Sequence, residues 1–331
     1  MAMERVPYLV GGGFEHSAEV MRAMLAASTS GAEGIVNAGD FKVRPLAVPS
    51  TSVRVAPGNA LIRNSYGGGQ AQTYACRAGS ETEVPIEATG SAGSRTDLIV
   101  ARIDDPTYQG GPFDPLTFEA ARFEVIRGVP ASTRTAAQLG LSYPAIALAR
   151  ITLPASTGTV TAGMITDLRK LAQPRKERSL YVHPRTVADG DSELRSTAET
   201  GMYWPEGITW RVDVPEWAQR VRVIGQLGGV MLRAAGGNAY GRIWVRLGSL
   251  GDPDGVDSQE TSWDLPSNLV GNVRESWMFG DDRLVPVGMR GRDVVIAPRA
   301  RVIGADSNAS RPLADSLSVL SIDVEFYETA V

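Results

Sequence analysis

Polar and apolar residues alternate along the stretch Arg220-Val221-Arg222-Val223-Ile224-Gly225-Gln226-Leu227. A period of two is the pattern of a β-strand with one buried face and one face in solvent. Similar alternation returns at residues 241–248 and 318–327, and two more apolar runs stand at residues 97–104 and 145–153. Short strands of this kind, separated by turns, predict a mainly β chain of two antiparallel β-sandwich, jelly-roll-like domains.

One segment near the N-terminus has helical periodicity instead. Residues 17–29 are predicted to form a short helix, with Ser17 as its N-cap and Glu19 at its positive end. Gly31 is expected to close it. Four apolar residues at helical spacing form one face: Val20, Met21, Met24 and Leu25. This face either covers one end of a β-domain or packs against copies of itself, so its residues are candidates for an oligomer interface.

Composition indicates where the chain divides. We expect an N-terminal segment at residues 1–35, a β-rich domain at 36–172, a linker at 173–188 and a Trp-rich β-sandwich domain at 189–331. The residues around 172–179 are polar and charged without any period, which is typical of a linker. All six tryptophans follow it.

The charge balance and the lack of long apolar runs exclude several classes of partner. The 331 residues include 33 basic and 37 acidic side chains, a formal net charge of −4, so no global positive field would attract nucleic acid or an anionic membrane. No apolar run approaches the ~20 residues that span a bilayer. The N-terminus lacks the basic-then-apolar order of a signal peptide. We therefore expect no nucleic-acid partner, no membrane insertion and synthesis in a cytoplasm without a signal peptide.

Residues that ligate metals are few. The only cysteine is Cys76 and the only histidines are His16 and His183, which excludes a Cys-based zinc site and argues against a multi-histidine centre. An acidic loop resembles part of a calcium loop, and its candidate ligands are Asp252, Asp254 and Asp257. Pro253 lies inside this loop and a solvated turn is the commoner structure for such a sequence. We expect no cofactor, with calcium as the one metal to test.

No pattern of catalytic residues stands out. The chain has no Gly-x-Ser-x-Gly motif to place a nucleophile beside either histidine. The adjacent acids Asp104-Asp105 and Asp281-Asp282 are interpreted as turn residues, because the two carboxylates of a glycosidase usually come from separate segments. The sequence therefore predicts a protein that is not an enzyme.

The tryptophans are the most suggestive feature of the C-terminal half. Trp210 and Trp244 lie within strand patterns and are expected in the core. Four others lie near turn residues and are the better candidates for exposed contacts with carbohydrate or a partner protein: Trp204, Trp217, Trp263 and Trp277. Core or subunit-interface positions remain the commoner alternative for these four as well.

Several segments of the first half are similar to one family of proteins. The stretches are Val53 to Ala60 with its Pro-Gly turn, Tyr143 to Ala155, and Ile165-Thr166-Asp167-Leu168-Arg169. Over about residues 30–172 the chain resembles minor tail proteins of siphophages that infect actinobacteria, with an upper-baseplate-like first domain. The resemblance implies a virion structural protein of the phage tail tip that forms a homo-oligomer, typically a trimer, and docks to other phage tail proteins.

Two alternatives and one local prediction complete the sequence-based interpretation. The C-terminal domain could instead bind host cell-wall glycan as a receptor-binding module, and a tail-associated glycan hydrolase or esterase is a remote alternative. Asp167 and Arg169 are predicted to form a structural pair that closes the first domain.

Overall fold

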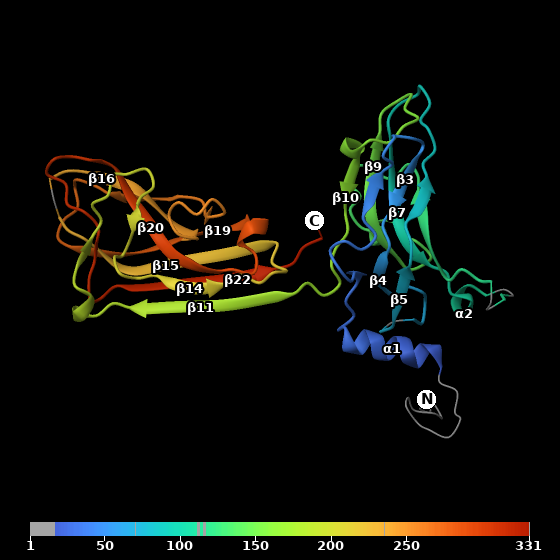
Figure 1. Ribbon diagram of the computed structural model, residues 1–331, viewed down its shortest axis with the longest axis horizontal. Coiled ribbons are helices and arrows are strands. Elements are labelled where there is room, and N and C mark those ends of the chain that lie inside the picture. Colours follow the sequence, from blue (N-terminus) through green and yellow to red (C-terminus); the bar gives the residue numbers. More distant parts are fainter. Residues whose placement is uncertain (1–16, 70, 111–112, 115–116, 235, 331) are drawn as a thin grey trace, which may run out of the picture. The chain divides into compact units, whose positions relative to one another are not determined.

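A computed structural model describes residues 17–330, except residues 70, 111–112, 115–116 and 235 (Figure 1). The first sixteen residues of the predicted N-terminal segment, which include His16, lie outside the described part of the chain. The chain divides into two compact units, unit 1 with Met1–Pro174 and Thr329–Val331, and unit 2 with Arg175–Glu328. Both units consist mainly of antiparallel β-sheets, which confirms the predicted fold class.

The predicted N-terminal helix is α1, Ala18–Ser28. The Ser17 hydroxyl accepts a hydrogen bond from the backbone N–H of Val20 at 3.1 Å, as an N-cap residue does. At the other end Gly31 has a φ of +65°, and its N–H donates to the carbonyl of Ala26 at 2.7 Å. A residue with a side chain would be strained in this left-handed conformation, so glycine closes the helix here.

Unit 1 contains three antiparallel sheets, which we name the β4, β3 and β7 sheets. The β4 sheet has the order β1 (Gly34–Ile35), β4 (Gly58–Arg63), β5 (Thr73–Ala78). The β3 sheet has the order β2 (Val43–Pro45), β3 (Ser52–Val55), β6 (Thr82–Pro85). The β7 sheet has the order β10 (Ile165–Asp167), β9 (Ala145–Leu153), β7 (Arg95–Ile103), β8 (Ala121–Ile126). A short helix, α2 (Pro106–Gln109), and 3-10 turns at Ala136–Leu139 and Ala162–Met164 join them.

The core of unit 1 lies on both faces of β7. Ile99, Ala101 and Ile103 contribute to the main cluster, together with residues of the β4 and β3 sheets. Leu98 and Val100 face a second, smaller cluster on the opposite side. Burial on both faces explains why residues 98–101 are all apolar instead of alternating with polar residues.

Unit 2 has the strand order of an eight-stranded jelly roll. One sheet, named the β15 sheet, has the order β11 (Lys176–Pro184), β22 (Val319–Tyr327), β15 (Arg220–Leu232), β19 (Val273–Leu284). The other, named the β20 sheet, has the order β14 (Trp210–Asp213), β20 (Asp293–Ala305), β16 (Ala239–Leu247), β18 (Thr261–Leu265). Numbered along the chain, these eight strands give the orders 1-8-3-6 and 2-7-4-5, which two Greek keys produce.

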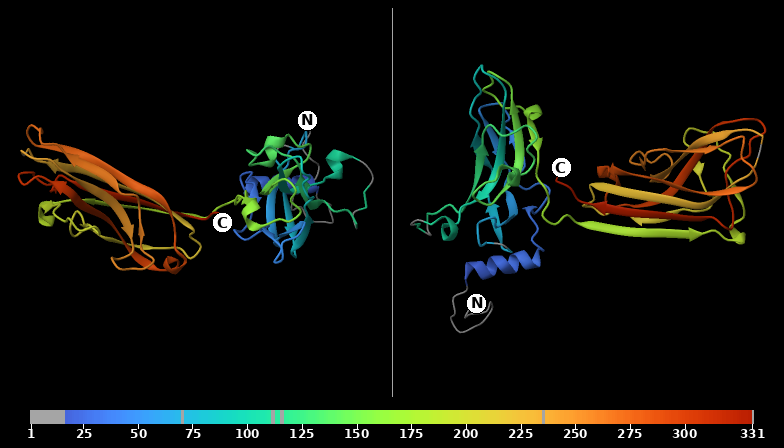
Figure 2. Two further views of the ribbon diagram at one scale, coloured as in Figure 1. Left: turned by 90° about the horizontal axis from the view of Figure 1, so that it is seen from above. Right: turned by 180° about the vertical axis from the view of Figure 1, so that it is seen from behind.

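Short strands and a turn complete unit 2. They are β12 (Ser192–Glu193) and β21 (Leu313–Ala314) beside the β15 sheet, β13 (Met202–Tyr203) and β17 (Val256–Asp257) beside the β20 sheet, and 3-10 turns at Val187–Asp189 and Val287–Met289. Two further views show the strands of unit 2 running in two layers (Figure 2). The jelly-roll order belongs to this unit, whereas unit 1 is built from three smaller sheets.

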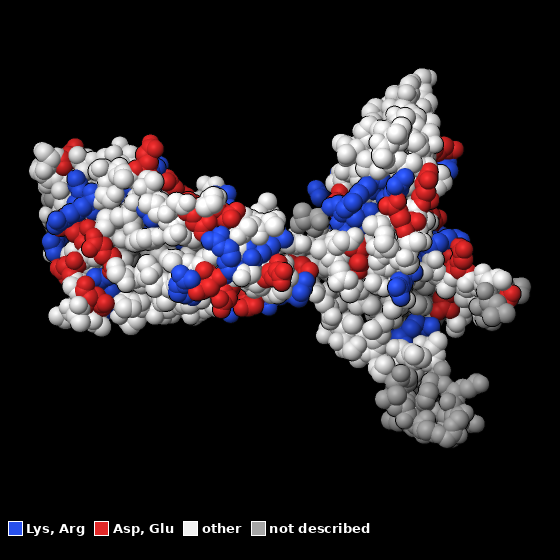
Figure 3. All heavy atoms as spheres, in the orientation of Figure 1, with Lys and Arg blue, Asp and Glu red and all other residues white. Residues whose placement is uncertain are grey.

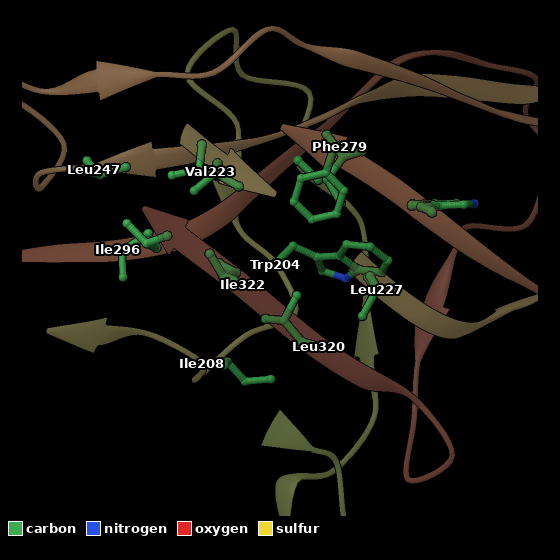
Figure 4. Close-up of a cluster of buried hydrophobic side chains, with 14 of the residues drawn as sticks. Trp204, Ile208, Val223, Leu227, Leu247, Phe279, Ile296, Leu320 and Ile322 are labelled. Atoms are coloured by element: carbon green, nitrogen blue, oxygen red, sulfur yellow. The ribbon is translucent and has the colours of Figure 1, made fainter. Parts of the chain in front are cut away.

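The alternating stretch at residues 220–227 fills the space between the two layers of unit 2. Val221, Val223 and Leu227 are fully buried or nearly so, while Arg222 points outward. Figure 4 shows Val223 and Leu227 beside Phe279, Ile322 and the other side chains of this cluster.

The prediction of a linker at residues 173–188 is wrong over most of that range. Residues 176–184 form β11, which pairs with β22 from Lys176 to Pro184. The boundary between the units lies at Pro174 and Arg175 instead. Polar side chains suit this strand because it lies at an edge and most of them are exposed, so backbone hydrogen bonds rather than an apolar pattern define it.

Candidate functional site

Helix α1 is held to the sheets of unit 1 by a largely buried arginine. The side chain of Arg22 is only 13% exposed, and its Nε donates to Oε1 of Gln72 at 2.8 Å. Its Nη1 lies 3.4 Å from Oδ2 of Asp105. The guanidinium also lies 5.0 Å from the ring centre of Tyr74 and 5.9 Å from that of Tyr108, within the range of cation–π attraction. Figures 1 and 2 show α1 across one end of unit 1, next to β5.

Asp105, the acidic partner of Arg22, is itself held by hydrogen bonds to the rest of unit 1. One carboxylate oxygen accepts the hydroxyl of Tyr74 at 2.8 Å, and the other accepts the backbone N–H of Thr107 at 2.9 Å at the start of α2. Burial raises the pKa of Asp105, but these hydrogen bonds and the charge of Arg22 outweigh burial and leave the pKa below its usual value. Asp105 is therefore a buried anionic partner for the helix, not the turn residue that the sequence indicated.

The apolar face predicted for α1 is divided between unit 1 and solvent. Leu25 and Val20 are half-buried, and Ala26 is buried against unit 1. Met21 and Met24 are 48% and 45% exposed. The helix thus covers Ala26 and part of its apolar face together with the largely buried Arg22, and it leaves the two methionines of that face exposed.

The predicted pair Asp167 and Arg169 is confirmed. Arg169 donates from Nε and Nη2 to the two carboxylate oxygens of Asp167, at 3.0 and 2.7 Å. Its Nη1 donates to the carbonyls of Ala38 and Asp40, at 2.8 and 2.7 Å. The pair joins the end of the β7 sheet to the loop before β2.

The tryptophans predicted to be exposed are mostly part of the core of unit 2. Trp204, Trp263 and Trp277 are 0%, 4% and 8% exposed, so their proposed role as a glycan-binding surface is wrong. Trp263 on β18 and Trp277 on β19 both point into the core, and their rings stack with the ring centres 5.7 Å apart. Trp204 donates from its indole nitrogen to the carbonyl of Ser192 at 3.1 Å. The nearby turn residues had suggested exposure, but strand register places these rings between the sheets.

The other three tryptophans are less buried or line a hollow. Trp210, expected in the core, is half-buried against it. Trp217 is half-buried, with the guanidinium of Arg175 5.2 Å from its ring centre. Trp244 is buried as predicted, yet it lines a surface hollow of about 280 Å³ with Asp257, Glu260 and Arg299. Its indole nitrogen already donates to Asp257 at 2.9 Å, and only 4% of the residue is exposed.

The three aspartates of the candidate calcium loop pair with arginines. Asp252 accepts from Arg292 at 2.7 Å, and Asp254 lies 3.6 Å from the same guanidinium. Asp257 accepts from Arg246 at 2.5 Å. Hydrogen bonds from Arg292 lower the pKa of Asp252. Within the described part of the chain no group of three or more acidic, histidine or cysteine side chains is placed to hold a metal ion.

His183 has a structural contact in the described structure. Its Nε2 lies 3.2 Å from Oδ1 of Asp189, and Oδ2 of the same carboxylate accepts from the backbone N–H and the hydroxyl of Thr186. This carboxylate therefore caps the turn at residues 187–189.

In the view of Figure 3 acidic and basic side chains lie next to one another in small groups on both units. Among the described residues, no helix is long and apolar enough to span a membrane.

Comparisons with known proteins leave the family open. No protein-family model matches the chain, and no curated protein matches its sequence. Solved structures similar to it include the VP2 subviral particle of infectious bursal disease virus, at 11% identity and a TM-score of 0.25 over 91% of this chain and 68% of that one. T=1 particles derived from infectious bursal virus match at 11% identity and a TM-score of 0.24, over 94% and 75%. The delta-endotoxin Cry8Ea1 from Bacillus thuringiensis matches at 8% identity and a TM-score of 0.19, over 90% and 51%. At such TM-scores these likenesses carry no inference about function.

Proposed function

We propose that this chain is a virion structural protein of a phage tail tip that works by homo-oligomeric assembly and by docking to other tail proteins. The tail-tip assignment rests on the resemblance of residues 30–172 to minor tail proteins. The assembly role rests on one observation, the orientation of α1. Arg22 and Asp105 hold the helix with Met21 and Met24 facing solvent.

The exposed methionines have a physical consequence for assembly. Covering a half-exposed methionine contributes about 1 kcal/mol, from the ~25 cal/mol per Å² of apolar area removed from water. The contact needs no rearrangement of unit 1, because the Arg22 contacts already fix the helix. Cyclic symmetry would bring one such face from each copy to a common axis, and a trimer is the state that the resemblance implies.

Light scattering of the purified chain tests this proposal. We expect a mass of three times the 35.3 kDa of one chain. The double variant Met21→Lys/Met24→Lys, called the α1 variant below, should lose the trimer. Val187→Lys is the matched control, because Val187 is 85% exposed and lies on unit 2. A wild-type mass of one chain, unchanged in the α1 variant, would contradict the assembly role, and absence of the chain from purified virions would contradict the tail assignment.

A further inference from the structure

The outer face of the β15 sheet is divided into a charged half and an apolar half. Alternate residues of β11, β22, β15 and β19 point away from the core and form rows across the four strands. Two adjacent rows make up what we name the apolar half: Leu180, Asp323, Ile224 and Gly280 in one row, and Val182, Ser321, Gln226 and Met278 in the next.

Large apolar side chains of these rows are exposed. Leu180 and Val182 are 65% and 51% exposed, Ile224 is 42% exposed, and Met278 is 70% exposed. These side chains form two groups, Leu180 with Val182 and Ile224 with Met278, and Asp323 and Ser321 of β22 lie between the groups. Exposed apolar groups gathered on one face of a sheet are typical of an interaction surface. Asp323 does not add a free charge to them, because Arg178 donates to both of its carboxylate oxygens, at 2.8 and 2.5 Å.

The charged half is neutralised within the same face. Arg222 pairs with Glu325 at 2.8 Å, and Arg220 pairs with Asp282 at 2.7 Å. Because these charges are satisfied inside one copy, another surface can approach the face without leaving an ion unpaired.

The apolar half contains a projection and a hollow next to each other on β19. Met278 is exposed and stands at the rim of a hollow of about 380 Å³, which Gly280, two residues further along, lines together with Ile224, Arg222 and Asp282. No side chain can fill this position, because a Cβ on Gly280 would lie 2.2 Å from the carbonyl oxygen of Val223 and its φ is +155°. Gly280 therefore contributes no side chain to the hollow.

We infer that the apolar half is a contact surface for a second copy of this chain. The two copies face each other and are related by a two-fold axis that runs between them, along the rows and perpendicular to the strands. An axis between the two rows exchanges them, because the rotation reverses the strand direction and keeps the strand order. Met278 of each copy then enters the hollow at Gly280 of the other, and Leu180 of each copy meets Val182 of the other. The surface is self-complementary, which an isologous contact requires. This inference rests on the proposed self-assembly and names a second surface for it.

The same axis avoids repulsion between charges. The row with Arg178, Glu325, Arg222 and Asp282 comes to lie over the row with Pro184, Val319 and Gly228, which carries no charge. Four strands about 4.8 Å apart and about nine residues long give a face of about 500–600 Å² per copy. A stable interface buries about 800 Å² per partner, so this contact should form at high chain concentration.

Light scattering over a concentration series tests the inference in the full-length chain. The α1 variant is the background, because it removes the proposed trimer contact and isolates the face of the β15 sheet. We expect its mass to rise from one to two chain masses with concentration. Met278→Glu should abolish the rise, and Leu180→Asp, a second variant at an exposed position, should do the same. Leu284→Glu is the matched control, since Leu284 is 60% exposed on the same strand and face but lies outside the apolar half.

The outcomes separate the two proposals. A rise in mass that Met278→Glu or Leu180→Asp removes and Leu284→Glu preserves supports the contact. A rise that all three variants preserve, or an α1 variant that stays at one chain mass at every concentration, overturns it, and a wild-type trimer would still stand. A wild-type chain at one chain mass at every concentration overturns both.

Discussion

Replacing Arg169 by methionine should destabilise unit 1 far more than a surface substitution would. The side chain of Arg169 is completely buried and donates four hydrogen bonds, two to Asp167 and two to the backbone carbonyls of Ala38 and Asp40. Methionine keeps most of the apolar length and removes every donor. The two carbonyls then lose their partner, and Asp167 keeps the backbone N–H of residue 169, at 3.1 Å, and Lys42, 3.6 Å away.

The expected loss follows from these contacts. A hydrogen bond that involves a charged group contributes about 1.5–3 kcal/mol, and the contributions of one side chain do not add fully. Asp167 is one-third exposed and regains water, which reduces its share. We therefore expect Arg169→Met to lower the free energy of unfolding of unit 1 by about 3–5 kcal/mol, the range for breaking a buried pair. The variant Asp167→Asn, which keeps the shape and removes the charge, should cost about 1–2 kcal/mol.

The chain offers an internal control for this measurement. All six tryptophans belong to unit 2, so tryptophan fluorescence follows the unfolding of unit 2, while circular dichroism follows both units. Arg169→Met should lower the stability of unit 1, which circular dichroism detects. The unfolding transition of unit 2, which tryptophan fluorescence follows, should stay unchanged. A loss below about 1 kcal/mol, or an equal shift of the fluorescence transition, would refute the reasoning.

The pair should also give a pH dependence of defined sign. Burial raises the pKa of Asp167, but hydrogen bonds from Arg169 and the charges of Arg169 and Lys42 outweigh burial and leave the pKa below its usual value. A lowered pKa in the folded state stabilises the fold above the unfolded pKa of about 3.9, and this contribution is lost as the pH falls through the folded pKa. The difference in stability between wild type and Arg169→Met should therefore shrink on acidification below about pH 4.

Two further predictions test the position of the helix and the role of the tryptophans. Arg22→Met removes the hydrogen bond to Gln72 and the ion pair with Asp105, so amide exchange across residues 18–28 should accelerate about 30-fold, the equivalent of about 2 kcal/mol; unchanged exchange, measured by mass spectrometry, would show that the helix is held by other contacts. Host cell-wall glycan should leave the tryptophan fluorescence of the chain unchanged, because Trp204, Trp263 and Trp277, three of the four candidate tryptophans, are buried; quenching that saturates with glycan would restore the receptor-binding alternative.

The strands were predictable where one face of a strand is buried and the other is in water. Residues 220–227 alternate because Val221 and Val223 enter the core while Arg222 does not. The limits of α1 were predictable because Ser17 and Gly31 act through local hydrogen bonds and backbone conformation. In both cases the physical cause lies within a few residues of the sequence, so no knowledge of distant contacts is needed.

Other features depend on contacts between distant parts of the chain. The residues of β11 have no apolar period, and they form a strand because β22, more than a hundred residues away, supplies the hydrogen bonds. Asp105 is followed by a proline and looks like a turn residue, but Tyr74 and Arg22 make it a buried anion. A signal was present in the sequence, since Asp105 closely follows the apolar stretch at residues 98–101, but that signal does not identify its partners.

The sequence by itself determined the β class, the position of the N-terminal helix and the local pair at Asp167 and Arg169, because short-range periodicity, capping and i, i+2 spacing encode them. Only the tertiary structure decided which tryptophans are buried, which face of α1 meets water, and that Met278 stands beside the hollow at Gly280 on an exposed sheet. These properties depend on which strands are neighbours and on which side of each sheet the second layer lies. Strand pairing across long separations sets both, and a single sequence does not specify it locally.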